Sequence, residues 1–188
     1  EHNKIVIVNG KVQQLSFEHE ESDKINLTTL DNINQSPNDH NSLLSLNNSF
    51  SNKIHNILLK KNYSFKKPLI IYQITNEKVS NTNINFQLKF ELEENSSIKI
   101  INLSEDNSEK NFINNLFNFN LSKNAILKNY KIDKKSNTNI KYDYSSIIQK
   151  ENSISETFIF SSGSDYIKNE VSCNPVSYTH LTLPTTLP

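Results

Sequence analysis

The chain of 188 residues has 20 Lys, no Arg and 20 acidic residues, so its formal net charge is zero. Such a chain lacks the positive surface that neutralises phosphate groups, which argues against nucleic acid or an anionic membrane as its main partner. A single cysteine, Cys173, excludes a disulfide framework and a multi-cysteine metal site within the chain, and no apolar run is long enough for a membrane-spanning helix.

The first predicted element is a β-hairpin over residues 4–15. Two runs rich in Ile and Val flank Asn9-Gly10. This dipeptide readily adopts the positive φ angles of a two-residue turn, so the pattern predicts two antiparallel strands.

Residues 16–50 are more polar and predict little regular structure. Leu27, Leu30 and Ile33 keep a weak helical spacing. Residues 39–50 predict a short helix whose buried face consists of Leu43, Leu44, Leu46 and Phe50.

From Ile54 onward, short strand-like runs alternate with polar turns. The clearest run is 86–92, in which every second residue is Phe or Leu, the alternation of a half-buried strand. The same spacing recurs in the pairs Phe117/Phe119, Tyr130/Ile132, Tyr142/Tyr144 and Phe158/Phe160. Many short strands at even spacing predict an all-β body.

An internal repeat distinguishes among the all-β architectures. Asn95, Asn124 and Asn152 each stand in a similar polar turn between two strands, with a period of roughly 28 residues. Asn tolerates the left-handed conformation that such turns require. A β-sandwich would show the same alternation without a fixed period, so the repeat favours a solenoid of stacked coils.

Both ends of the sequence are expected to be artificial. The chain starts at Glu1 and contains no Met, which indicates a missing N-terminus. Residues 175–188 switch abruptly to Thr, Leu and Pro and resemble translated sequencing-adapter sequence, so we exclude them from the predicted fold. The predicted parts are an N-terminal hairpin and short helical region (1–50), truncated β-helix coils (51–174) and an artefactual tail (175–188).

Catalytic and metal-binding patterns are not found in the sequence. Two glycines cannot build a phosphate-binding loop, and the five histidines are scattered without metal-ligand spacing. We interpret Cys173 as an ordinary strand residue, and the acidic pairs Glu20-Glu21 and Glu93-Glu94 as solvated surface. The predicted catalytic and metal-binding residues are therefore none, and cofactor-binding residues stay unknown.

Several segments resemble the SufB/SufD family of iron–sulfur cluster assembly proteins, in the order that family shows. The similar segments are the hairpin at 5–11, Leu46-Asn-Asn-Ser-Phe50 before the first coil, 57–71 in that coil, the turns at 92–96 and 124–126, and 166–170. Two departures are Lys168, where the family usually has Arg, and Ser96-Ser97 in place of small apolar residues.

This resemblance implies a mainly β protein, a right-handed parallel β-helix preceded by a small hairpin and helical region. It further implies a SufD-type subunit that is a scaffold and not an enzyme. Such a subunit pairs with a SufB-like subunit through the β-helix and with a SufC-like ATPase through a C-terminal part. The complex, located in the cytoplasm, handles the iron–sulfur cluster, and no cofactor is expected in this fragment.

Two other functions fit a β-solenoid. An extracellular enzyme that acts on polysaccharide predicts an upstream signal peptide and carboxylates clustered on one outer face. A structural or adhesive solenoid predicts many further repeats downstream. The region that follows Asn174 in the natural gene would separate these alternatives.

Overall fold

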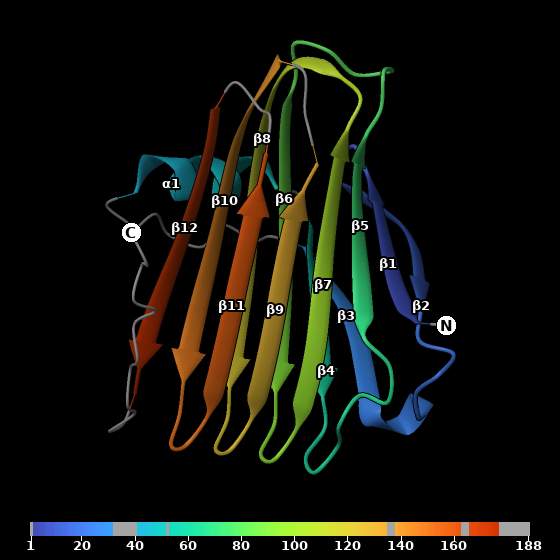
Figure 1. Ribbon diagram of the computed structural model, residues 1–188, viewed down its shortest axis with the longest axis vertical. Helices are drawn as coiled ribbons and strands as arrows, with labels where there is room; N and C mark the ends of the chain where they lie inside the picture. Colours follow the sequence, from blue (N-terminus) through green and yellow to red (C-terminus); the bar gives the residue numbers. More distant parts are fainter. Residues whose placement is uncertain (1, 32–40, 52, 135–137, 163–165, 177–188) are drawn as a thin grey trace.

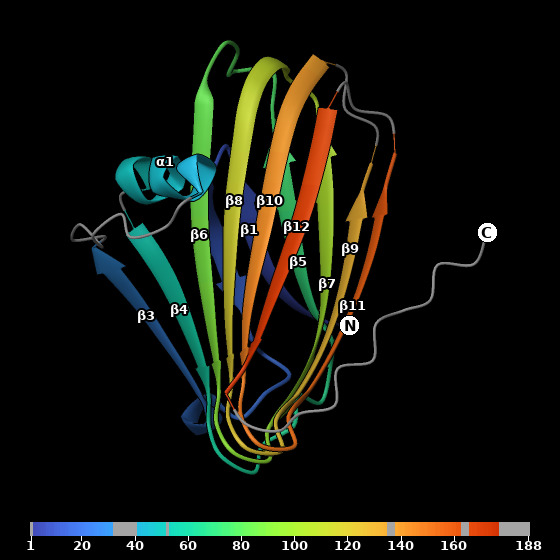
Figure 2. The ribbon, with the colours of Figure 1, turned by 90° about the vertical axis from the view of Figure 1, so that its left-hand side faces the viewer.

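The computed structural model describes residues 2–31, 41–51, 53–134, 138–162 and 166–176. In these ranges the chain forms two facing β-sheets with one α-helix against the outside (Figures 1 and 2). Sheet A contains β1 (Asn3–Val8), β2 (Lys11–Ser16), β5 (Leu69–Thr75), β7 (Ser97–Asp106), β9 (Ile126–Asp133) and β11 (Ile154–Ser161). Sheet B contains β3 (Ile25–Asp31), β4 (Lys53–Leu59), β6 (Asn83–Leu92), β8 (Glu109–Leu121), β10 (Thr138–Gln149) and β12 (Tyr166–Pro175).

The chain alternates between the two sheets from β4 to β12. Each strand pairs in parallel with the strand two positions further on, so β4, β6, β8, β10 and β12 stack in one sheet and β5, β7, β9 and β11 in the other. In Figure 1 strands β5, β7, β9 and β11 run upward in front, strands β6, β8, β10 and β12 run downward behind, and successive coils move to the left. The fold is a right-handed parallel β-helix, which confirms the predicted class.

Asparagine residues mark the turns between coils, as the repeat predicted. Asn95, Asn124 and Asn152 have φ of 56°, 56° and 53°, and Asn62, which the repeat did not include, has φ of 58°. The amide of Asn95 donates to Asn62 Oδ1 (2.8 Å), and that of Asn124 donates to Asn95 Oδ1 (2.9 Å). Asn therefore suits the left-handed backbone of these turns, and its side chains also hydrogen-bond adjacent coils to one another.

The predicted hairpin is present and forms part of the solenoid. β1 and β2 pair antiparallel around Asn9 (φ 51°) and Gly10 (φ 74°), the conformation of a tight hairpin turn. β1 also pairs in parallel with β5. The first strand of the expected N-terminal region thus lies in the same sheet as the β-helix coils.

The weak helical spacing after the hairpin does not form a helix. Leu27 and Leu30 lie in β3, which pairs antiparallel with β4, while Ile33 lies outside the described residues. A 3₁₀ turn, η1 (Ser22–Lys24), precedes this strand. By pairing with β4, the segment hydrogen-bonds a complete row of its backbone groups. This gain outweighs the weak preference for a helix that three spaced apolar residues provide.

The predicted helix is α1 (Ser42–Phe50), which covers the outer face of sheet B. Asn41 caps it, since its side-chain oxygen accepts from the N–H groups of the second and third following residues at 3.0 and 3.4 Å. Leu44 is buried against Leu116 and Tyr142. The prediction for Phe50 was wrong, because this side chain is 60% exposed at the end of the helix.

The main core lies between the sheets, where apolar side chains of successive coils stack on one another. Phe90 and Phe119 stack in adjacent coils with ring centroids 5.3 Å apart, and both are almost fully buried. Burying one such side chain contributes about 1.5–3 kcal/mol. The stack therefore holds neighbouring coils together chiefly by hydrophobic contact.

The end of the chain bears on two sequence predictions. β12 continues to Pro175, while residues 177–188 of the expected artefactual tail lie outside the described residues. Within the described part of the chain, no helix has the length and apolar character needed to cross a membrane.

Candidate functional site

The histidines in the described ranges lie far apart from one another in their contacts. Within the described ranges, no group of three or more His, Cys, Asp and Glu side chains could hold a metal ion. His2 contacts the hydroxyl of Tyr72 (3.1 Å) and His55 contacts that of Thr29 (3.1 Å), so these rings have separate surroundings. His40 and His180 lie outside the described residues.

Cys173 lies in β12, in register with core positions of the preceding coils. It pairs with Ile147, which pairs with Phe119, and both of these residues are buried in the core. The thiol is exposed in this structure, although partial burial raises its pKa. A raised pKa keeps the sulfur protonated at neutral pH, which does not favour a nucleophile or a metal ligand.

One of the two acidic pairs is more than solvated surface. The carboxylate of Glu20 accepts hydrogen bonds from Tyr63 Oη (2.7 Å), Asn3 Nδ2 (2.7 Å) and the backbone N–H groups of Lys66 and Lys67 (3.1 Å). Burial alone would raise its pKa, but these hydrogen bonds outweigh burial and hold the pKa below its usual value. Glu20 therefore fixes the loop before β5, contrary to the prediction.

The pair Glu93-Glu94 behaves as predicted. Glu94 forms an exposed ion pair with Lys61 (2.9 Å), and Glu93 accepts from the backbone N–H of Lys61 (2.8 Å).

The most distinctive chemical group is a set of four charged side chains inside the β-helix. Lys131 and Asp133 project inward from β9, and Lys141 and Asp143 project inward from β10; all four are at most 6% exposed. Lys131 hydrogen-bonds Asp143, and Lys141 donates to Asp133 (2.6 Å). The cross pairs lie at 3.4 Å (Lys141–Asp143) and 3.8 Å (Lys131–Asp133), so the four form one closed network, the ionic cluster.

Four neutral side chains complete the hydrogen bonding of the ionic cluster. Each lies 2.6 or 2.7 Å from the charged group that it contacts. They come from four further strands: Ser104 (β7), Asn115 (β8), Ser161 (β11) and Asn169 (β12). The ionic cluster thus connects three successive coils by directional bonds.

Burial and mutual attraction oppose each other in the ionic cluster. Burial lowers the pKa of Lys131, and the nearby charge of Asp143 only partly offsets this effect. Burial acts in the same direction on Lys141, but the charges of Asp143 and Asp133 outweigh it and raise the pKa. Burial would raise the pKa of Asp143, whereas the two lysines hold it below its usual value.

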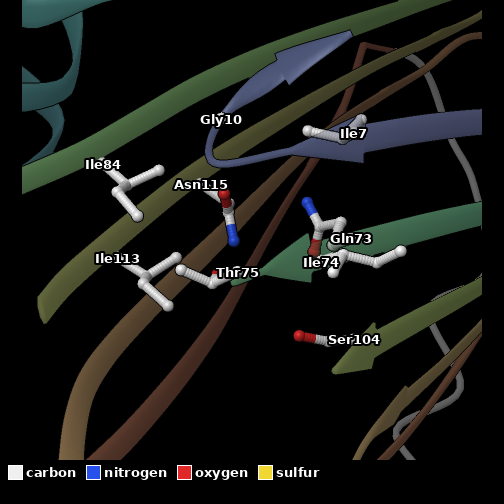
Figure 3. Close-up of a pocket in the computed structure, with 9 residues that line it drawn as sticks. All are labelled: Ile7, Gly10, Gln73, Ile74, Thr75, Ile84, Ser104, Ile113 and Asn115. Atoms are coloured by element: carbon white, nitrogen blue, oxygen red, sulfur yellow. The ribbon is translucent and has the colours of Figure 1, made fainter. Parts of the chain in front are cut away.

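A small cavity lies next to the ionic cluster, inside the coils (Figure 3). Its volume of about 20 Å³ is enough for one water molecule. Ser104 and Asn115, which bond to the ionic cluster, also line this cavity, together with Gln73. Gln73 Oε1 is buried and has no hydrogen-bond partner among the described residues, so the cavity has a polar acceptor for a water.

The ionic cluster and its cavity are better suited to fixing the coils than to binding a substrate. Each charged group is paired, and the cavity is too small for an organic substrate. A buried, fully paired network can fix the relative position of coils, because a shift would leave charges unpaired.

Sequence reasoning missed the ionic cluster, although a signal was present. Lys131-Ile-Asp133 and Lys141-Tyr-Asp143 repeat the pattern Lys-x-Asp on consecutive strands. Residues two apart on a strand share a face, so each Lys and Asp had to point the same way. The aromatic and aliphatic residues between them made the opposite face look like the core.

The comparisons with known proteins agree with the fold. Residues 72–177 match the family described as SUF system FeS cluster assembly, SufBD core domain. No curated protein matches the chain. The match covers more than half of the chain and begins in β5, so it includes the ionic cluster and the coils around it. This parallel β-helix belongs to the SufBD core family of the SUF system for iron–sulfur cluster assembly.

Proposed function

We propose that the chain is a SufD-type subunit that serves as a non-enzymatic scaffold in a SufB–SufC–SufD complex. The observation that carries the proposal is the combination of the SufBD core match with a rigid interior whose charged groups bond to one another. A stack of coils tied in this way can hold a partner subunit in a fixed position without chemistry of its own. The complex would carry the iron–sulfur cluster in the cytoplasm.

The outer face of β11 supports pairing with a SufB-like subunit. Phe158 and Phe160 lie on this face, in register with Tyr130 and Ile132 of β9, and both side chains are more than half exposed. Large apolar side chains exposed side by side are typical of surfaces that bind another protein. A SufC-like ATPase would bind through a region C-terminal to these coils.

Co-purification with the two partner types tests the proposal. We expect a tagged chain, co-expressed with a SufB-type and a SufC-type protein, to retain the SufB-type protein. Phe158→Glu places a charge on the outer face of β11 and should abolish this retention. The control is Leu30→Glu, an exposed apolar residue at the other end of the solenoid.

The outcomes separate the assignments. Retention of the SufB-type protein that Phe158→Glu removes and Leu30→Glu preserves supports the SufD-type scaffold. Retention of a SufD-type protein in preference to a SufB-type one would instead make this chain the SufB-type subunit. Capture of neither partner would refute the scaffold role.

A further inference from the structure

A groove at the N-terminal end of the β-helix is separate from the ionic cluster and from the last coil. Its volume is about 1060 Å³, and its walls are the β1–β2 turn, the end of α1 and the first residues of β4 and β6. Gly10 and Ile84 form its inner end and separate it from the small cavity of Figure 3. A side chain at Gly10 would meet Ile84 Cγ2 at 2.7 Å, so the two walls are in close contact there.

The charged side chains among the described lining residues of the groove are both lysines. Lys11 and Lys53 are exposed on opposite walls, and the described lining contains no acidic residue. Neither lysine forms an ion pair within the described part of the chain, whereas many other exposed lysines do, such as Lys61 and Lys123. In a chain with zero net charge, two unpaired lysines facing one groove favour a negatively charged occupant.

Apolar and amide groups lie between the two lysines. Phe50 projects from the end of α1 and is 60% exposed, while Val12 and Val79 provide further apolar surface. Asn85 Oδ1 is buried in the wall without a hydrogen-bond partner among the described residues. Such a mixture suits a peptide with alternating acidic and apolar side chains better than a simple inorganic ion.

The β2 strand offers a backbone edge beside the groove. It is the end strand of sheet A and pairs only with β1 among the described strands. Residues 11–13 of β2 line the groove, so an extended chain that paired with this edge would place side chains between the lysines. Peptides commonly bind exposed sheet edges in this way.

We propose that the groove binds an extended acidic segment of a partner protein, which adds to the edge of β2. Lys11 and Lys53 would pair with its carboxylates, and Phe50 would cover its apolar side chains. This site lies at the opposite end of the solenoid from the last coil, so the partner could bind while the last coil is occupied.

Fluorescence anisotropy with a labelled peptide of about eight residues, alternating Glu and Val, tests the proposal on the full chain. We expect saturable binding at low salt, weakened at least about tenfold by Lys11→Glu combined with Lys53→Glu. The matched control, Lys60→Glu combined with Lys150→Glu, changes the net charge equally on lysines outside the groove and should bind normally.

Two further probes leave the protein unchanged. A peptide with Lys in place of Glu should not bind, because the charges would repel. An acidic peptide methylated on alternate backbone nitrogens should bind at least about tenfold more weakly, because it cannot donate to a strand edge. Equal binding of the acidic and basic peptides, equal loss in the two double variants, or full binding of the methylated peptide would overturn the proposal.

Discussion

Replacing Asp143 by Asn is the most direct test of the ionic cluster. The change keeps the shape of the side chain and the contact with Asn115, but it removes one of two negative charges from a network with two positive ones. Lys131 and Lys141 would then share only Asp133. The interior would contain one uncompensated positive charge.

The cost can be estimated from the burial of the group. Asp143 is 3% exposed, and breaking a buried ion pair by removing one partner typically costs about 3–5 kcal/mol. With a urea dependence of about 2 kcal/mol per M for a chain of this size, the midpoint of unfolding should fall by about 1.5–2.5 M. The exposed Asp31→Asn control should change stability by no more than about 0.5 kcal/mol.

The pH dependence gives a second, independent signature. The pKa of Lys131 already lies below its usual value because of burial, and the loss of the Asp143 charge should lower it further. The unfolded chain then binds more protons than the folded one between the lowered pKa and the ordinary pKa of lysine, so stability rises with pH in that window. The defect of Asp143→Asn should therefore shrink as the pH rises through the window in which folded Lys131 has lost its proton in the variant but keeps it in the unchanged chain.

A combined variant tests whether the charges themselves stabilise the fold. Replacing the four charges and their four neutral partners by apolar residues of similar size should leave stability unchanged or raise it by about 1–4 kcal/mol, because no buried charge or polar group is then left unpaired. Urea unfolding measured by circular dichroism at several pH values checks all these variants. A cost below about 1 kcal/mol for Asp143→Asn, with no dependence on pH, would refute the claim that the four charges form one buried network.

The remaining predictions concern the parts that position the coils. Glu20→Gln should cost about 1–2 kcal/mol relative to the exposed control Glu18→Gln, and because its folded pKa is lowered, that contribution should disappear as the pH of a urea titration falls below about 4. Asn95→Ala should lower the thermal midpoint through a cost of about 1–2 kcal/mol at φ 56°, whereas Asn95→Gly should cost less because Gly adopts this conformation freely. Leu44→Ala should cost about 2–3 kcal/mol and speed hydrogen exchange of the α1 amides, while the amides of the Phe90–Phe119 stack keep their protection.

The solenoid could be predicted because its turns have a local cause. Asn9-Gly10 specifies a hairpin by its backbone preferences alone, and Asn95, Asn124 and Asn152 specify left-handed turns for the same reason. These residues act within a few positions of themselves, so their spacing in the sequence reports the spacing of the coils directly. Asn62 was missed because the earlier coil is longer, which breaks the period of roughly 28 residues.

The orientation of several strands could not be predicted by hydrophobic alternation. Phe117 and Phe119 face the core, as their pattern indicates, but Tyr130 and Tyr142 face outward. Alternation defines two faces of a strand and does not say which is inside. The helix α1 partly covers the outer face of β10 at Tyr142, which makes an aromatic side chain favourable there. The contact between Asn41 and Tyr142 joins residues about one hundred positions apart, so it cannot be read from a local pattern.

Two kinds of contact hold the coils of the solenoid together. Apolar contacts such as that of Phe90 with Phe119 tolerate small shifts, because hydrophobic contact has no preferred direction. The ionic cluster and its four neutral partners instead connect the strands from β7 to β12 by directional hydrogen bonds. Hydrogen bonds to charged groups at 2.6 and 2.7 Å do not tolerate such shifts, so these coils are held in a fixed register that apolar contact alone would not impose.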